Sequence, residues 1–334
     1  MNDTIKIVAA GIEVEIPNAW ERLTPENFRF LVDKWNRAEQ GELSPGIIRL
    51  LLLCQLMGWR IEKLRNDGSL ETAIALSEQL TFLYRINYGE NADLLNSLEP
   101  ADREQCERVD PWLLNLPLAR ALRRLKYQYV PDLCFAAQLV PILEPKGNRA
   151  YKGYEIQLSH GALTTSLCAL QFLEAQEVVN QITSKADNAE ATSLLTLLAA
   201  ILYLPGEYSS EAAHRLSKEF ETVDLLTLQC VLMNFQAFCA YLFTRTQFSL
   251  LTQIEGRTPA PISTNGLDAL YDLSKDGLGD AKKVENINLI TYLRLMRKKV
   301  IDAVRQMKEM DFDLPKISTE TGLPIRIIEK IITH

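Results

Sequence analysis

Apolar residues recur at helical spacing in most segments of this chain that are longer than ten residues, and this periodicity limits the fold more than any other feature. One segment opens with Thr24-Pro25-Glu26, which supplies a capping side chain, a proline at the first helical position and an acid in the first turn. The apolar positions that follow share one helix face: Phe28, Leu31, Val32 and Trp35. We therefore expect a mainly α-helical protein, with helices over more than half of the chain.

The N-terminal residues follow a different pattern. Residues 5–8 and 12–16 are β-prone runs on either side of Gly11, and the second run alternates isoleucine and valine with glutamate. Alternation with a period of two is typical of a strand with one buried face. The sequence predicts a small β-hairpin here, followed by the helix that begins near Thr24 and by an apolar helix over residues 47–57.

The same order of elements recurs in the second half of the chain. Residues 153–158 lie 142 positions after residues 11–16, and the same offset pairs Phe30-Leu31 with Phe172-Leu173. An apolar helix over residues 194–204 follows, in the position of the earlier apolar helix. Two explanations remain open: an internal duplication, in which the two stretches superpose as strand, helix and helix, or two unrelated helical lobes.

Prolines and turn residues divide the chain. Five prolines between positions 111 and 145 limit any helix there to short pieces, and a turn-rich stretch comes next. We expect a helical lobe with its hairpin over residues 1–148 and a second helical lobe over residues 149–285, each opening with a short β-element. Residues 255–265, rich in Gly, Pro, Ser and Thr, are predicted to form the most mobile loop.

The third predicted segment, residues 286–334, differs from the rest in charge. Between residues 281 and 308 there are eight Lys/Arg and only two acids, and the apolar residues form one helical stripe. Residues 317–332 then resemble a helix-turn-helix, with Gly322 at the turn. The basic side chains form either a solvated helix face or a contact surface. The candidate contact residues are Arg294, Arg297, Lys298, Lys299, Arg305, Arg326 and Lys330.

A contact surface of this kind serves either a protein partner or a nucleic-acid backbone. The second helix of the turn offers Arg326, Glu329, Lys330 and Thr333 but no Asn or Gln for reading adenine. The net charge of −7 gives the chain no global attraction to nucleic acid or to an anionic membrane. Docking onto a protein is therefore the favoured interpretation, and binding to nucleic acid is the alternative.

The sequence offers no pattern that is typical of an active site or a metal site. His160, His214 and His334 are far apart, and none stands at metal-ligand spacing from another ligand. No nucleophile elbow, glycine-rich phosphate loop or zinc-protease motif occurs. We predict that the protein is not an enzyme and uses no metal or cofactor.

Cysteine usage and hydropathy bear on the compartment. Six cysteines are scattered without a C-x-x-C pair, which fits free thiols in a reducing compartment. The N-terminal residues lack the basic and apolar regions of a secretory signal, and the longest apolar runs are too short to span a membrane. The expected location is the cytoplasm.

Two stretches carry a resemblance to a known group of proteins. Residues 265–284, with residues 289–293 after them, are similar to a pattern in accessory tail proteins of tailed phages of gut bacteria, and residues 194–205 are similar to another part of these proteins. The resemblance covers residues 153–310. It implies a helical protein without an active site that acts in tail or baseplate assembly or is a minor virion component. Its partners would be other phage structural proteins, in the bacterial host cytoplasm or in the virion.

Two functional hypotheses follow. The first is a non-enzymatic phage or prophage interaction protein that displays helical surfaces to other structural proteins or to a second copy of itself. Its candidate anchors are Trp20, Trp35, Trp59 and Trp112, although a tryptophan is more often a core residue than a contact residue. The second is a nucleic-acid-binding regulator that uses the basic helix and the C-terminal turn. The acidic net charge and the lack of base-reading side chains favour the first hypothesis.

Overall fold

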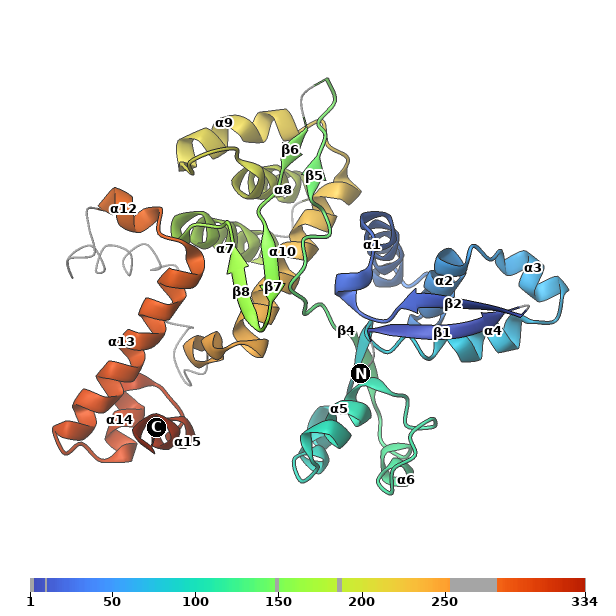
Figure 1. Ribbon diagram of the computed structural model, residues 1–334, viewed down its shortest axis with the longest axis horizontal. Helices are drawn as coiled ribbons and strands as arrows, with labels where there is room; N and C mark the ends of the chain where they lie inside the picture. The colour runs from blue at the N-terminus through green and yellow to red at the C-terminus, as the bar shows by residue number, and fades with distance from the viewer. Residues whose placement is uncertain (1–2, 10, 148–149, 185–187, 253–280, 334) are drawn as a thin grey trace. The chain divides into compact units, whose positions relative to one another are not determined.

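The computed structural model describes residues 3–9, 11–147, 150–184, 188–252 and 281–333 (Figure 1). Of these residues, 60% lie in helices and 11% in strands. Every sheet among them is an antiparallel pair of strands. The prediction of a mainly α-helical fold is therefore confirmed. The loop expected over residues 255–265 lies outside the described residues.

The chain forms two compact units, Met1–Leu133 and Cys134–His334. This division comes earlier than the boundary expected after residue 148, because the segment before that point is bonded to the second unit. The buried side chain of Asn234 accepts a hydrogen bond from the Leu139 N–H at 2.6 Å and donates one to the Ala137 carbonyl at 2.8 Å. The Phe135 N–H also donates to the Ala237 carbonyl and the Tyr203 hydroxyl to the Val140 carbonyl, so several bonds fix this segment on the second unit.

The first unit opens with a hairpin of β1 (Thr4–Ala9) and β2 (Ile12–Pro17), as the alternating pattern predicts. Ile7 and Ile16 are buried on one face, whereas Lys6 and Glu13 form an ion pair at 2.6 Å on the other. A short 3₁₀ turn and four helices follow: η1 (Trp20–Arg22), α1 (Pro25–Glu39), α2 (Pro45–Met57), α3 (Ile61–Asn66) and α4 (Leu70–Ser77).

Local signals fix the ends of the first two helices. The Thr24 hydroxyl accepts a hydrogen bond from the Asn27 N–H at 3.3 Å, and the Ser44 hydroxyl accepts one from the Ile47 N–H at 3.5 Å. Each capping residue is followed by a proline, which has no N–H to leave unpaired. Helix α2 ends at Gly58, whose φ of 65° suits glycine.

A second part of this unit lies between two paired strands that the sequence did not predict. Strand β3 (Tyr84–Asn87) pairs with β4 (Gln128–Pro131), and residues 88–127 between them form what we call the insert. The insert contains η2 (Gly89–Leu95), α5 (Pro100–Arg108) and α6 (Ala119–Leu122). These elements surround a small core made of Ile86, Tyr88, Leu95, Cys106, Leu114, Ala119 and Leu122.

Two tryptophans form an aromatic cluster in the first unit. The Trp20 ring centroid lies 5.5 Å from that of Trp35 and 5.0 Å from that of Phe82. The Trp20 indole N–H donates a hydrogen bond to the Asp132 carbonyl at 2.8 Å, and the Trp35 indole N–H donates one to the Tyr84 hydroxyl at 3.1 Å. Trp20 and Trp35 are therefore core residues, which is the commoner role of a tryptophan, and they are not surface anchors.

Arg49 of α2 is a buried cation in the same unit, with 5% of its surface exposed. Its guanidinium lies over the rings of Tyr84 and Tyr129, at 5.4 and 4.8 Å from their centroids. Its Nε and Nη2 atoms have no hydrogen-bond acceptor among the described residues. Cation–π contact is thus what stabilises this charge.

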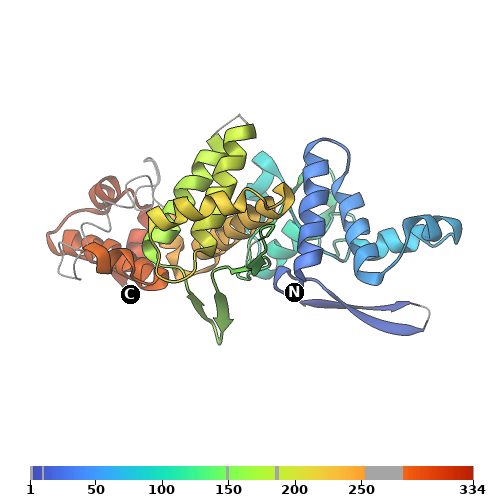
Figure 2. The ribbon, with the colours of Figure 1, turned by 90° about the horizontal axis from the view of Figure 1, so that it is seen from above.

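The second unit packs its helices around one large core (Figures 1 and 2). Ring centroids of Phe235 and Phe172 lie 5.8 Å apart near its centre, and Tyr154 lies 6.3 Å from Phe235. Ser209 and Asp224 cap two of its helices through hydrogen bonds from backbone N–H groups. The helices are α7 (Ala169–Ser184), α8 (Asn188–Tyr203), α9 (Ser210–Phe220), α10 (Leu225–Arg245), η3 (Gln247–Thr252), α12 (Ala281–Glu285) and α13 (Leu289–Glu309).

Two small sheets belong to this unit. Strand β5 (Ile142–Leu143) pairs with β6 (Tyr151–Lys152), across the boundary that the sequence suggested. Strand β7 (Ile156–Ser159) pairs with β8 (Ala162–Thr165) in a hairpin that projects from the helices (Figure 2). The prediction of a β-element near residues 154–158 is confirmed, and β5 and β6 were not foreseen.

The order hairpin, helix, helix occurs in both units, as β1–β2, α1, α2 and as β7–β8, α7, α8. The strands do not correspond as the offset of 142 suggests, because residues 11–16 form the second strand of one hairpin and residues 153–158 lead into the first strand of the other. The shared order agrees with an internal duplication. Superposition of the two stretches stays a prediction.

One helix among the described residues, α10, is long and apolar enough to span a membrane by length and composition. Its buried residues include Leu228, Phe235 and Leu242, which belong to the large core. A helix at the centre of a core needs apolar side chains on most sides, and this requirement accounts for the composition of α10.

Candidate interaction surfaces

The C-terminal corner, residues 297–333, contains the second half of α13 and two short helices, α14 (Leu314–Thr321) and α15 (Ile325–Thr333). A small core of its own is made of Val304, Ile317, Leu323 and Ile328. The first half of α13 lies in the large core of the second unit. Because one continuous helix joins the two cores, residues 286–334 are attached to that unit more firmly than the expected division into segments implies.

The corner has the dimensions of a helix-turn-helix: eight residues in α14, three in the turn and nine in α15. Asp313 caps α14 by accepting a hydrogen bond from the Lys316 N–H at 2.9 Å. Gly322 has a φ of 71°, and its N–H donates to the Ser318 carbonyl at 2.8 Å. The Ser318 hydroxyl donates to the Leu323 carbonyl at 2.7 Å, which closes the turn.

The structure separates the seven predicted contact residues into three groups. Arg294, Lys298 and Arg305 are exposed on the side of α13 opposite to its buried residues. Arg326 and Lys330 are exposed one turn apart on α15. Lys299 is exposed on the flank of α13, whereas Arg297 is half-buried and its Nε atom has no acceptor among the described residues. The exposed basic residues therefore form two short rows.

The rows are not purely basic. Asp302 and Glu309 share the exposed side of α13, and Glu329 is exposed on α15. Residues 286–334 contain nine Lys/Arg and six Asp/Glu, a net charge of +3 in a chain of net charge −7. Two apolar side chains, Met310 and Ile325, are 58% and 42% exposed in the same corner. The surface thus combines apolar and oppositely charged groups.

Arg294 also lines a cavity of about 330 Å³. The cavity lies between the end of the β7–β8 hairpin, with Leu158 and Gly161, and the C-terminal part of α10, with Tyr241 and Arg245. Two arginines from different helices meet here. The sequence predicted Arg294 as a contact residue and gave no signal for the cavity or for Arg245, because the hairpin reaches this place only in the folded chain.

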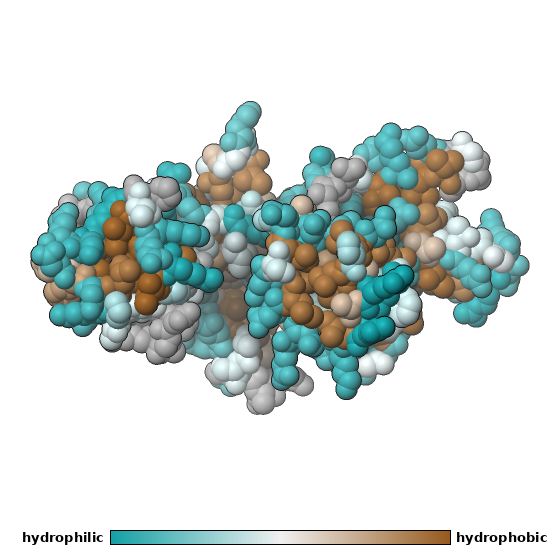
Figure 3. Space-filling model, turned by 90° about the horizontal axis from the view of Figure 1, so that it is seen from below, coloured by the Kyte–Doolittle hydropathy of each residue, from teal (hydrophilic) through white to brown (hydrophobic). Residues whose placement is uncertain are grey.

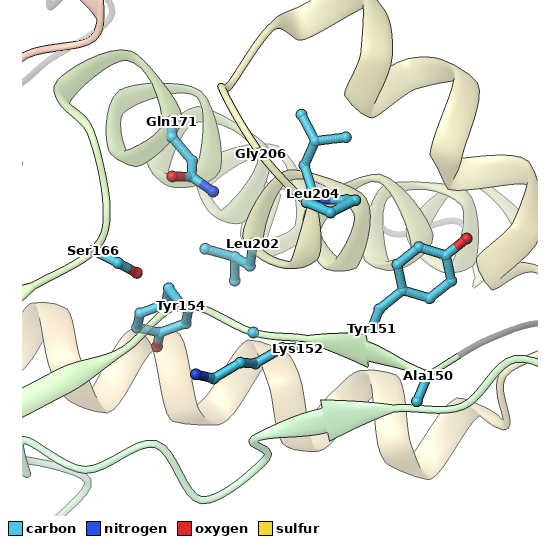
Figure 4. A pocket seen from close by; sticks show the side chains of 11 residues that line it. Ala150, Tyr151, Lys152, Tyr154, Ser166, Gln171, Leu202, Leu204 and Gly206 are labelled. Carbon is cyan, nitrogen blue, oxygen red and sulfur yellow. The ribbon is translucent and has the colours of Figure 1, made fainter.

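A larger cavity of about 470 Å³ lies between β6, the start of α7 and the end of α8 (Figure 4). The Gln171 amide lies over it and donates a hydrogen bond to the Ile201 carbonyl at 2.7 Å, whereas the Tyr151 hydroxyl points away and donates to a Glu219 carboxylate oxygen at 2.5 Å. Lys152 is the basic residue of the lining, and its ammonium pairs with Glu155. The lining supplies hydrogen-bonding and apolar groups without a nucleophile beside a base.

Buried thiols are the nearest approach to reactive groups. Burial raises the pKa of the Cys54, Cys106 and Cys168 thiols, so these cysteines stay protonated at neutral pH and are weak nucleophiles. All six cysteines are free.

His160 forms the β7–β8 turn with Gly161, and its Nδ1 lies 2.9 Å from the Ser159 hydroxyl. The described residues contain no group of three His, Cys, Asp or Glu that could hold a metal ion.

The structure sorts the four tryptophans in a way that the sequence could not. Trp20 and Trp35 are 4% and 5% exposed, Trp59 is half-buried, and Trp112 is 66% exposed. Trp112 and its exposed neighbour Leu113 lie in the insert, which sequence reasoning treated only as a region of short pieces. The sequence shows that Trp112 is a large aromatic residue, but its exposure depends on the packing of the insert.

Comparison of the chain with family models, with curated proteins and with solved structures gives no match. The resemblance of residues 153–310 to phage tail proteins therefore stays an expectation from the sequence.

Proposed function

We propose that the protein is a non-enzymatic interaction protein of a tailed phage or prophage, which acts in tail or baseplate assembly through its helical surfaces. The observation that carries this proposal is the C-terminal corner, which has a small core of its own. Its surface exposes Met310 at the end of α13 and Ile325, Arg326 and Lys330 on α15. Exposed apolar anchors within a polar rim are typical of protein interfaces. The phage setting rests on the resemblance of residues 153–310. The partners are then other structural proteins of the particle, met in the host cytoplasm.

A nucleic-acid-binding regulator is the second candidate. It is favoured by the eight-, three- and nine-residue arrangement of the corner, with a left-handed glycine at the turn. It is disfavoured by the exposed Glu329 on α15 and by the lack of Asn or Gln on that helix. A net charge of −7 also weakens attraction to a polyanion.

The test compares charge reversal on the corner with the same reversal elsewhere. The double variant R326E/K330E changes α15, and the matched control R215E/K218E changes two residues of α9 by the same net charge. Substitution is better than deletion of α14 and α15, because deletion would expose the buried Val304. Each form is expressed with the products of the adjacent genes, checked for helicity by circular dichroism and assayed by co-purification.

We expect R326E/K330E to lose a partner that both the wild type and R215E/K218E retain. Equal retention by all three forms would remove the corner from the interface. Duplex DNA is titrated in parallel at low and high salt. If the wild type and R215E/K218E bind duplex DNA tightly and with steep salt dependence, and R326E/K330E does not, the regulator replaces the assembly protein as the proposed function.

A further inference from the structure

A turn of the insert, residues 110–113, presents two large apolar side chains to solvent. Trp112 is 66% exposed and Leu113 is 54% exposed. The neighbouring Pro111 and Leu114 are buried, so the turn is anchored on both sides of the exposed pair. Large exposed aromatic side chains on a fixed backbone are the commonest anchors of protein interfaces.

The backbone of this turn is held by side chains of the insert. A carboxylate oxygen of Asp110 accepts a hydrogen bond from the Trp112 N–H at 2.8 Å. The Arg123 guanidinium donates to the Pro111 carbonyl at 2.8 Å and to the Trp112 carbonyl at 3.3 Å, and it lies 5.2 Å from the centroid of the indole ring. The indole is thus positioned before any partner arrives, which lowers the entropy cost of binding.

The segment that carries Arg123 is strongly basic. Residues 119–126 contain four Lys/Arg and no acid. Arg120, Arg124 and Lys126 are exposed and form no ion pair among the described residues. Arg120 and Arg124 lie three residues and one residue from Arg123, so the segment that contacts the indole also carries these exposed cations. Figure 3 views the molecule from the side of α5 and α6 in Figure 1 and shows apolar surface interrupted by strongly hydrophilic side chains.

We propose that Trp112, Leu113, Arg120, Arg124 and Lys126 form a docking surface for an acidic segment of a partner protein that also carries apolar side chains. The unpaired cations select carboxylates, and the Trp112–Leu113 pair takes the apolar side chains. A protein fits better than a nucleic acid because the exposed Leu113 has no counterpart in base stacking, and because Arg123 already covers one face of the indole. This surface lies in the insert, so binding there can be absent while the C-terminal corner binds a partner. Binding at the corner can likewise be absent while the insert binds the acidic segment.

The test uses the full-length protein and a synthetic peptide of repeated Glu-Glu-Leu-Phe units, with a Lys-Lys-Leu-Phe peptide and oligothymidylate as competitors of different charge or class. Binding is followed by calorimetry at low and high salt. We expect the acidic peptide alone to bind, and binding to weaken at least about tenfold in W112A and in R120E/R124E. W112F and the charge-matched control R215E/K218E should bind like the wild type.

Four results would overturn the proposal. Equal binding by W112A and the wild type would exclude the indole, and equal binding of the acidic and basic peptides would exclude charge selection. If oligothymidylate binds more tightly than the peptide and W112A abolishes this binding, the surface is a binding site for single-stranded nucleic acid. Failure of the acidic peptide to bind at all would also reject it. Circular dichroism of each variant shows that the fold is kept.

Discussion

The two units of the protein are stabilised in different ways. The second unit has one large core, to which α7, α8, α10 and the first half of α13 contribute, and the small core of the C-terminal corner. The first unit has two small cores beside its buried aromatic cluster, and polar contacts fix its short elements. Arg85 of β3 and Arg108 of α5 both pair with Asp132, at 3.1 and 2.8 Å. One carboxylate thus ties a strand, a helix of the insert and the end of β4 together.

This difference follows from the lengths of the elements. Helices with long apolar faces bury enough surface to position one another, whereas short elements leave their arrangement to hydrogen bonds, ion pairs and buried cations such as Arg49. Local stability should therefore differ between the units. We expect the helices around the large core of the second unit to unfold together and the insert of the first unit to open by itself.

The substitution Phe235→Ala should have the largest effect. Phe235 is fully buried, and its ring contacts those of Phe172 and Tyr154 in the large core. The cavity left behind should lower the free energy of unfolding by about 3–5 kcal/mol. Chemical denaturation measures this loss, and hydrogen exchange should quicken in α7, α8 and α10 together. Faster exchange in α10 alone would contradict a single cooperative core.

The substitution Leu122→Ala should be less costly and should act locally. Leu122 is fully buried in the small core of the insert, and its truncation should cost about 2–4 kcal/mol. Hydrogen exchange should quicken in residues 88–127 while α1 and α2 stay protected. Leu118→Ala, which removes a half-buried side chain packed against the same core, is the matched and milder control. Loss of protection throughout the first unit would show that the insert is not an independent folding element.

The parts of the fold that the sequence predicted are those fixed by neighbours in the chain. The capping residue Thr24 lies three residues from the N–H group that it binds, so a local pattern reveals it. Pairing of β3 with β4 across the insert has no such local signal. The attachment of residues 134–140 to the second unit has no local signal either, because it depends on distant residues such as Asn234 and Tyr203.

The candidate surfaces show the same limit. Helical periodicity correctly placed Arg294, Lys298 and Arg305 on the exposed side of α13, because one helix repeats its faces regularly. Periodicity could not distinguish Trp112 from the buried Trp20 and Trp35. The exposure of a tryptophan in a turn is decided by which residues pack around it, and in the insert these come from separate elements.

Replacing one glycine in each unit by alanine should change stability in opposite directions. A Cβ at Gly153 would lie 2.8 Å from Cε1 of the Tyr203 ring, and that ring is fully buried with its hydroxyl bonded to the Val140 carbonyl. Gly153→Ala should therefore cost about 1–3 kcal/mol. Gly46 in α2 has nothing within 4 Å of an added Cβ, and Gly46→Ala should raise stability by about 0.5–1 kcal/mol. Thermal denaturation of both variants checks the pair, and destabilisation by Gly46→Ala would contradict an open site in α2.

The smallest expected effect concerns two buried tyrosines with different partners. Tyr84 in the first unit accepts the Trp35 indole N–H, whereas the Tyr292 hydroxyl in the second unit has no hydrogen-bond partner among the described residues. Removing a hydroxyl that lacks a partner relieves a desolvation cost, and removing one that has a partner leaves a buried donor unpaired. At neutral pH, Tyr292→Phe should therefore gain about 1 kcal/mol and Tyr84→Phe should lose about 1 kcal/mol.

Alkaline pH extends this comparison, because burial raises the pKa of both tyrosines from 10.0 to about 12. Below pH 10 both hydroxyls are protonated in the folded and unfolded states, so their ionisation takes no stability from the folded state. Between pH 10 and 12 the unfolded chain loses these protons first, and each tyrosine should cost the folded state up to about 3 kcal/mol. Each phenylalanine variant should lose stability less steeply than the wild type when denaturation is repeated across this range. A Tyr292→Phe variant that is less stable than the wild type at neutral pH would mean that the Tyr292 hydroxyl has a bonding partner after all.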